Sequence, residues 1–235
     1  MPTRKVVEFL EPNGSSPYAK WFARLDAVAA AKVATALYRM EQGNLSNVKA
    51  VGQGVAEYRI DFGPGYRIYI GQDGDVLIIL LGGGTKKGQN ADIQLAQQRW
   101  RDYNDRHGWR KLEQRREQLP DAQEEVSTMP ITRKFRDTVW TRAQSDTRFR
   151  TAMLTEAINE LLAGDLDTGK AMLRDYVNAS ITFDGLAKAT RLPTKSLQRM
   201  LGPRGNPTAE SLFAIFKVLQ KSERIRLAVT HKRAA

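Results

Sequence analysis

The first hydrophobic pattern along the chain has the period of an α-helix. Apolar side chains recur every three or four residues from Phe22 to Met40. The pair Ser16-Pro17 just before them is typical of a helix start, because serine caps free N–H groups and proline fits the first turn. Gly43 is a plausible end. The pattern predicts a helix over residues 17–42.

Between residues 57 and 81 the pattern changes to the period of a β-strand. Apolar and polar side chains alternate over 57–62, which is typical of a half-buried strand, and a longer apolar run is typical of a buried one. The predicted segments are a strand at 57–62, a turn at 63–65, a strand through Ile68 and Ile70, a turn at 72–75, a buried strand at 76–81 and, after Gly82-Gly83-Gly84, a helix from Ile93 to Trp100.

The first turn fixes which polar residues lie together. A three-residue loop over Gly63-Pro64-Gly65 places Asp61 opposite Arg67 and Arg59 opposite Tyr69. Charged groups and a phenol then share the face turned away from the core. This predicted polar face carries Glu57, Arg59, Asp61, Arg67 and Tyr69, and Lys86 and Lys87 follow the neighbouring strand.

Such a face suits RNA cleavage by the substrate's own 2′-hydroxyl. Arginine and lysine would stabilise the extra charge on a five-coordinate phosphorus. The two histidines, His107 and His231, lie outside the predicted sheet, so proton transfer would fall to Glu57, Tyr69 or a lysine. The alternative is ordinary cross-strand ion pairing on an exposed sheet, such as Asp61 with Arg67.

A resemblance favours the first interpretation. Residues 57–69 (EYRIDFGPGYRIY), 80–87 (LLGGGTKK) and 92–103 resemble RelE/ParE-type toxins, within them the HigB-like addiction module killer proteins. The resemblance implies a compact α+β domain, with two N-terminal helical segments packed on a small antiparallel sheet, and messenger-RNA cleavage on the ribosome. Arg59, Arg67 and Lys87 match basic positions of that family, with Lys86 beside them. Asp61 stands where many relatives have lysine, and the C-terminal tyrosine or histidine of some branches is missing.

The second half of the chain has helical spacing only. Apolar residues and capping residues predict five helices, the third and fourth joined by the tight turn Arg191-Leu192-Pro193. The predicted helices begin at Asp146, at Asp165 or Asp167, at Thr182, at Thr194 and after Asn206-Pro207-Thr208. The layout is that of a helix-turn-helix protein, and a plain helical bundle with a basic surface is the alternative.

In a helix-turn-helix protein the helix at 194–201 would enter the major groove of DNA. The candidate DNA-binding residues are Thr194, Lys195, Ser196, Gln198 and Arg199 on that helix and Arg204 after it. Residues 186–208 (LAKATRLPTKSLQRMLGPRGNPT) resemble the XRE-type domain of HigA-like antitoxins. Relatives usually have glycine at Arg191, so a positive φ there would cost about 1 kcal/mol.

Charge and composition support two domains connected by a linker. Residues 1–108 carry 14 Lys and Arg against 11 Asp and Glu, 109–128 carry 4 against 5, and 129–235 carry 19 against 10. Most of the net charge of +11 therefore belongs to the half expected to meet a phosphate backbone. We expect a toxin domain at 1–108, a polar linker at 109–129 and an antitoxin domain at 130–235. With no cysteine and no apolar leader, we expect a cytoplasmic protein without metal or cofactor.

The two resemblances together predict a single-chain toxin–antitoxin protein. Its endoribonuclease, in residues 1–108, would be masked within the chain by an antitoxin that binds operator DNA as a homodimer and represses its own promoter. The expected partners are messenger RNA on the ribosome and operator DNA, and no membrane. One alternative is a DNA-binding regulator with an inert toxin-like half. In another, Met129 begins a separate protein.

Overall fold

The computed structural model describes the backbone of residues 3–116 and 130–229. Side chains are described for residues 3–108 and 130–229. It is a mixed α/β protein with a six-stranded sheet. By its internal contacts the chain divides into two compact units, residues 1–139 and 140–235. The division falls inside a helix, ten residues beyond the start of the second domain expected from sequence. No helix in the described parts is long and apolar enough to cross a membrane.

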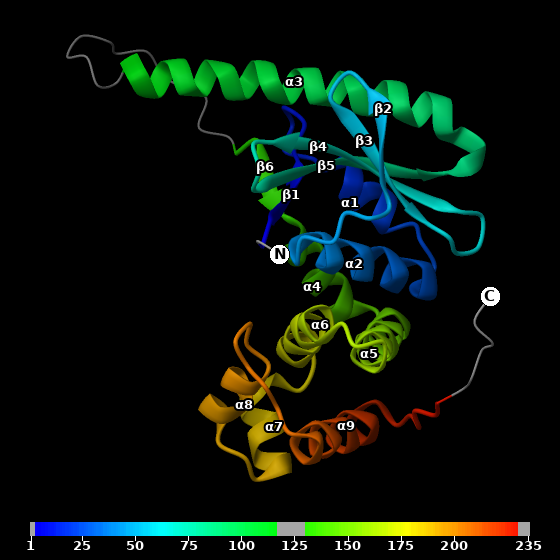
Figure 1. Ribbon diagram of the computed structural model, residues 1–235, viewed down its shortest axis with the longest axis vertical. Helices are drawn as coiled ribbons and strands as arrows, with labels where there is room; N and C mark the ends of the chain where they lie inside the picture. The colour runs from blue at the N-terminus through cyan, green and yellow to red at the C-terminus, as the bar shows by residue number, and fades with distance from the viewer. Residues whose placement is uncertain (1–2, 117–129, 230–235) are drawn as a thin grey trace. The chain divides into compact units, whose positions relative to one another are not determined.

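The first unit is a mixed sheet with helices on both faces (Figure 1). Its strand order is β2-β3-β4-β5-β1-β6; β1 and β5 are parallel and the other neighbours antiparallel. The expected purely antiparallel sheet is therefore wrong. The elements are β1 (Lys5–Phe9), α1 (Pro17–Phe22), α2 (Ala27–Glu41), β2 (Val48–Gly52), β3 (Val55–Ile60), β4 (Tyr66–Asp73), β5 (Leu77–Thr85), a 3₁₀ turn (Lys86–Gly88), α3 (Gln89–Arg116), β6 (Thr132–Lys134) and the start of α4 (Phe135–Ser145).

Two short helices replace the single helix expected over 17–42. Ser16 caps α1 as predicted, because its Oγ accepts a hydrogen bond from the N–H of Ala19 at 3.0 Å. The chain then leaves the helix, and Asp26 caps α2 by accepting from the N–H groups of Val28 and Ala29. The aspartate is the local signal that the hydrophobic period alone did not show.

The sheet is buried on both faces. Tyr58, Ile68 and Ile78 lie on the face toward α1 and α2, whereas a core cluster that includes Tyr69 and Trp100 packs under α3 on the other. The prediction of a half-buried sheet is therefore wrong, because α3 covers the face that the alternation marked as polar.

β6 follows the expected linker but belongs to the first unit. It pairs with β1, and the Arg133 guanidinium contacts the buried Glu8 carboxylate at 2.8 Å. Phe135 after it is fully buried and packs edge-on against Tyr38. β6 is the last strand of the sheet, at the edge opposite β2, and it covers the backbone edge of β1. Three strands separate it from β3.

The described residues of the second unit form helices and no strand. After the end of α4 come α5 (Thr147–Leu162), α6 (Leu166–Ala179), α7 (Thr182–Thr190), α8 (Thr194–Met200) and α9 (Ala209–Glu223). The predicted caps are confirmed: Asp146, Asp165 and Thr208 each accept a backbone N–H in the first turn of their helix. A partly buried hydrogen-bonded group, in which Arg150 and Tyr176 both donate to Glu223, joins α5, α6 and α9.

Candidate functional site

The β3–β4 hairpin brings the predicted basic residues together in a register other than the expected one. Arg59 lies opposite Arg67, and Glu57 lies opposite Tyr69. The connecting loop spans residues 61–65, two residues longer than predicted. A slip of two residues keeps every side chain on its predicted face, whereas a slip of one would have reversed them all.

Glu57 is the centre of the cluster. Its side chain is fully buried; Arg59 and Gln89 donate hydrogen bonds to its two oxygens, and Arg67 forms an ion pair with it. Arg59 Nε donates to Oε1 at 2.7 Å, Gln89 Nε2 donates to Oε2 at 2.9 Å, and Arg67 Nε lies 3.3 Å from Oε2. With these lone pairs occupied, Glu57 is suited to orienting the two guanidinium groups rather than to taking a proton.

The two arginines present different surfaces. The Arg59 side chain is 43% exposed and that of Arg67 is 11% exposed. Like charges placed directly opposite repel each other, and the Glu57 carboxylate offsets that repulsion. The pair therefore forms a fixed positive group at the sheet surface. The alternative ion pair with Asp61 is not formed among the described residues, because Asp61 lies exposed in the loop.

Tyr69 does not lie on an open face. It is 1% exposed and belongs to the cluster beneath α3 with Ala96 and Trp100. Burial raises its pKa to about 12; the nearby carboxylates of Asp92 and Glu57 add to this effect and Arg67 opposes it. A phenol with that pKa stays protonated at neutral pH. Tyr69 is therefore wrong as a candidate base on an exposed surface.

Lys86 and Lys87 are exposed in the 3₁₀ turn that joins β5 to α3. With Gln89 and Asn90 they line a shallow hollow of about 320 Å³ at the first turn of α3. The first N–H groups of a helix lack partners within it and favour an anion. Because Gln89 also bonds Glu57, the hollow and the arginine cluster are joined by one side chain.

Sequence reasoning missed one basic residue of this region. Lys49 on β2 lies opposite Glu57 in the antiparallel pairing and is exposed. Its strand has little hydrophobic alternation and was not predicted, so no signal assigned Lys49 to the sheet. The pairing of β2 with β3 shows that Lys49 belongs to the sheet.

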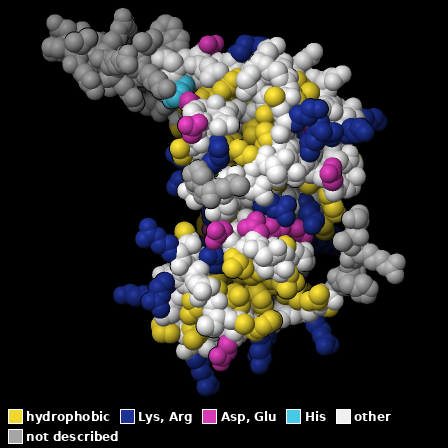
Figure 2. Space-filling view, viewed as in Figure 1, with side chains coloured by type: hydrophobic (Ala, Val, Ile, Leu, Met, Phe, Trp, Pro, Cys, Tyr) yellow, Lys and Arg dark blue, Asp and Glu magenta, His cyan; other side chains and the backbone are white. Residues whose placement is uncertain are grey.

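The predicted DNA-binding residues lie on α8 and in the loop that follows it. Lys195, Gln198, Arg199 and Arg204 are exposed, whereas Ser196 is half-buried. Thr194 is also half-buried, and its hydroxyl donates to Asp184 at 2.9 Å, so it joins α8 to α7. Figure 2 shows Lys and Arg side chains along the margin of this unit, around an apolar area.

A backbone conformation and a side-chain hydrogen bond shape the segments on either side of α8. Arg191, in the turn before it, has φ 60° and ψ 21°, the left-handed conformation expected where relatives have glycine. Lys170 Nζ donates to the carbonyl of Gly205 at 2.8 Å and so holds the loop that carries Arg204. The turn before α8 and the loop after it are thus each set by a specific local feature.

Comparison with known proteins identifies one relative. A Haemophilus influenzae (strain KW20 / Rd) protein, whose description names no function, is 42% identical over 77 residues, which make up 32% of this chain and 78% of that protein. That protein is therefore much shorter than this chain. No family model matches the chain, and no solved structure matches it. At this identity and coverage, the chain belongs to the protein family that includes the H. influenzae protein.

Proposed function

We propose that this chain is a single-chain toxin–antitoxin protein. The first unit is an endoribonuclease that cleaves messenger RNA on the ribosome, and the second binds operator DNA and keeps the nuclease silent. The observation that carries the nuclease assignment is the cluster in which Glu57 holds Arg59 and Arg67 beside the Lys86–Lys87 turn. It is a preformed site for a phosphate group.

The chemistry follows from the charges. The RNA 2′-oxygen attacks the adjacent phosphorus, the bond from phosphorus to the 5′-oxygen breaks, and a 2′,3′-cyclic phosphate and a 5′-hydroxyl result. Arg59 and Arg67 stabilise the added negative charge of the transition state. A solvent base takes the 2′-hydroxyl proton. An ammonium group of Lys86 or Lys87 protonates the leaving oxygen, because Tyr69 is buried and Glu57 is occupied.

The second unit is proposed to be an XRE-like helix-turn-helix domain, which binds DNA as a homodimer with α8 in the major groove. Exposed Lys195, Gln198 and Arg199 suit base and phosphate contacts, and Arg204 suits a phosphate. The left-handed Arg191 turn supports this assignment, because it sets the angle between α7 and α8.

The length of the relative supports an origin from two proteins. A segment that makes up most of one protein and a third of this chain indicates that one part of this chain also occurs separately. Joining the parts fixes their ratio and gives a local concentration that can reach the millimolar range for a flexible tether.

A second candidate is a DNA-binding regulator whose toxin-like unit is inactive. Two observations favour it: the burial of Tyr69, and Asp61 at a position where lysine would add to the positive group. In that case the inactive first unit would serve only for dimerisation or docking.

Expression of residues 1–145 beside the full chain tests both candidates. The fragment keeps β6 and α4 and omits the rest of the second unit. A self-neutralised nuclease predicts growth arrest and messenger-RNA loss with the fragment, none with the full chain, and none with a fragment carrying Lys86→Ala and Lys87→Ala. Growth unaffected by any fragment would favour the regulator.

A further inference from the structure

The outer edge of β1 is completed by a strand from beyond the expected linker. β6 follows residues 109–129 and so lies in the part of the chain where sequence predicted a separate second domain. It nevertheless pairs antiparallel with β1, over three residues of each strand. Addition of a strand to the edge of a sheet is also a common way for one polypeptide to bind another.

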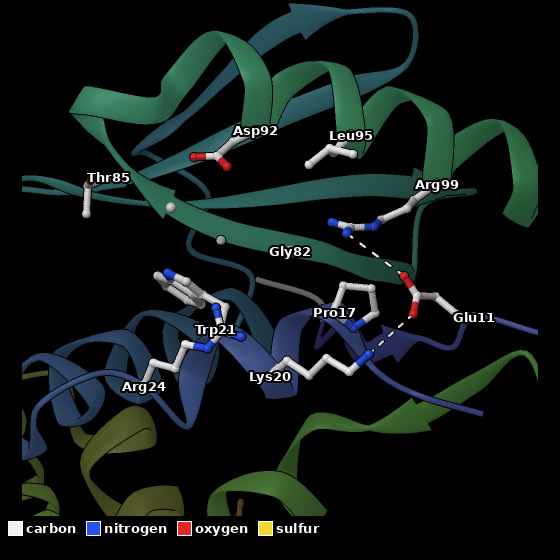
Figure 3. A pocket seen from close by; sticks show the side chains of 12 residues that line it. Glu11, Pro17, Lys20, Trp21, Arg24, Gly82, Thr85, Asp92, Leu95 and Arg99 are labelled. Atoms are coloured by element: carbon white, nitrogen blue, oxygen red, sulfur yellow. Dashed lines mark ion pairs between the residues drawn. The ribbon is translucent and has the colours of Figure 1, made fainter. Parts of the chain in front are cut away.

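A second strand edge of the first unit is covered in a different way. Past Leu80, where its pairing with β1 ends, β5 borders a hollow of about 490 Å³ between α1 and α3 (Figure 3). Trp21 lies against Gly83 there, and Arg99 donates to the carbonyl of Leu81 at 3.0 Å. Side chains that precede the linker thus protect β5, whereas the outer edge of β1 is covered by residues that follow it.

A buried carboxylate on β1 is matched to the incoming strand. The Glu8 side chain is fully buried, and Arg133 Nη2 donates to its Oε2 at 2.8 Å. Among the described residues Glu8 Oε1 has no hydrogen-bond partner, so Arg133 is the cation that compensates this charge. An ionised carboxylate that loses such a partner is costly to keep buried. The edge of β1 therefore carries a specific site for an arginine.

The residues two positions before and after Arg133 also enter the first unit. Ile131 belongs to the core cluster beneath α3, and its carbonyl accepts the N–H of Leu10 at 2.9 Å. Phe135 is fully buried, with its ring centroid 5.4 Å from that of Tyr38 on α2. Alternate residues of one extended segment thus fill three different sites.

Arg136 adds a contact at the end of this segment. Its Nε lies 3.1 Å from Glu41 Oε2 and 3.3 Å from Oε1, and its guanidinium lies 4.8 Å from the centre of the Tyr38 ring. All of these contacts lie within the first unit. Aromatic and arginine side chains of this kind carry most of the binding energy in interfaces between proteins.

We propose that residues 131–136 form an anchor segment, which binds the second part of the chain to the first unit without the linker. The backbone of β6 supplies the pairing with β1, and Arg133, Phe135 and Arg136 supply the specific contacts. α4 begins within the anchor segment and runs as one helix into the second unit. A chain cut between residues 116 and 130 therefore stays together as a complex of two polypeptides.

The anchor segment attaches the second part without covering the arginine cluster. β6 lies three strands away from β3, and the Arg59 side chain is 43% exposed with the anchor segment in place. If the first unit is the proposed nuclease, other residues of the second part must mask it, and cutting the linker does not release it. This consequence rests on the proposed function, whereas the anchor segment itself does not.

Size-exclusion chromatography of a chain cut in the linker tests the inference. A protease recognition sequence is inserted between residues 120 and 121 of the full chain, and complete cutting is verified on a denaturing gel. We expect both pieces to elute together, at the volume of the uncut chain. A dilution series with a fluorescent label on the N-terminus then gives the dissociation constant by anisotropy.

Variants of the cut chain identify the residues that hold the pieces together. Arg133→Ala with Phe135→Ala should weaken association at least about a hundredfold, as expected when two anchors of an interface are removed. Lys134→Ala, which changes an exposed residue of the same strand, is the matched control and should leave association unchanged.

The uncut variants separate binding from folding. With the linker intact, the double variant should still melt cooperatively, so that loss of association after cutting reports binding. If it does not, Arg136→Ala tests the same segment, because its guanidinium is partly exposed; it should weaken association about tenfold.

Separation of the pieces after cutting the unchanged chain would overturn the anchor segment. Association that neither the double variant nor Arg136→Ala weakens, or that Lys134→Ala weakens equally, would show that other contacts hold the pieces and would also overturn it. The measurement needs no RNA. Pieces that stay together, with no RNA cleavage by residues 1–145, would refute the nuclease alone, and cleavage by that fragment with pieces that separate would refute the anchor segment alone.

Discussion

Arg59 and Arg67 lie directly opposite each other on β3 and β4, and one buried carboxylate contacts both. Without Glu57 the pair would be a repulsive contact in the sheet. With it, two guanidinium groups are held in place before any substrate arrives. Preorganised positive charge of this kind is what a phosphoryl transition state requires.

Replacement of Glu57 by glutamine should therefore lower both stability and nuclease activity. We expect a loss of about 2 kcal/mol, less than for a fully buried pair because Arg59 is partly exposed. Urea denaturation of the full chain measures it. Asp61→Asn, which changes an exposed loop carboxylate, is the matched control and should have little effect. Equal stability of the two variants would show that Glu57 does not hold the pair.

Loss of Lys86 and Lys87 should affect activity without affecting stability. Both side chains are exposed, so Lys86→Ala with Lys87→Ala should leave the melting temperature unchanged within about one degree. RNA cleavage by residues 1–145 should fall about a hundredfold, as for removal of a transition-state donor. The pair Lys49→Ala and Lys5→Ala compares one basic residue opposite Glu57 with one on β1. Unchanged cleavage after loss of both turn lysines would exclude their role.

The raised pKa of Asp92 has a defined consequence for stability. Burial disfavours the ionised form, so the folded state loses stability as pH rises past the ordinary pKa of the carboxyl group. Asp92→Asn should then raise the melting temperature at pH 7 and leave it nearly unchanged at pH 3, where the carboxyl is protonated in both states. A lower melting temperature at pH 7 would contradict the account.

The turn before α8 carries a measurable strain. Arg191 adopts φ 60° without being glycine, so Arg191→Gly should stabilise the second unit by up to about 1 kcal/mol. Part of the gain is offset because glycine is more flexible in the unfolded chain. Arg191→Ala keeps the strain and removes the charge, so it should bring no such gain. Thermal denaturation of the three proteins compares them, and a destabilised Arg191→Gly would refute the strain.

The features that sequence predicted best are local. Ser16, Asp146 and Thr208 cap the first turns of their helices, because capping needs only neighbouring residues. The resemblance marked Arg191 as a position where relatives have glycine, and its φ of 60° shows that the arginine adopts the left-handed conformation there. The alternation of apolar and polar residues likewise assigned Glu57 and its polar neighbours to one face of the hairpin.

Long-range pairing was not predictable in the same way. β1 and β6 are short and pair with residues far along the chain, so no local pattern identifies them. The hairpin register was wrong by two residues because the Gly63-Pro64-Gly65 turn fits more than one loop length. The covering of Tyr69 by α3 depends on tertiary packing, which the alternation of a single strand does not contain.

The most direct test of the central claim is a purified translation reaction with one messenger RNA, to which residues 1–145 or the full chain is added. The account predicts ribosome-dependent cleavage by the fragment, at a rate at least about a hundredfold above that of the full chain. It also predicts that Lys86→Ala with Lys87→Ala lowers the fragment's activity about a hundredfold. Cleavage by the full chain at the fragment's rate would contradict masking, and no cleavage by either would contradict the nuclease.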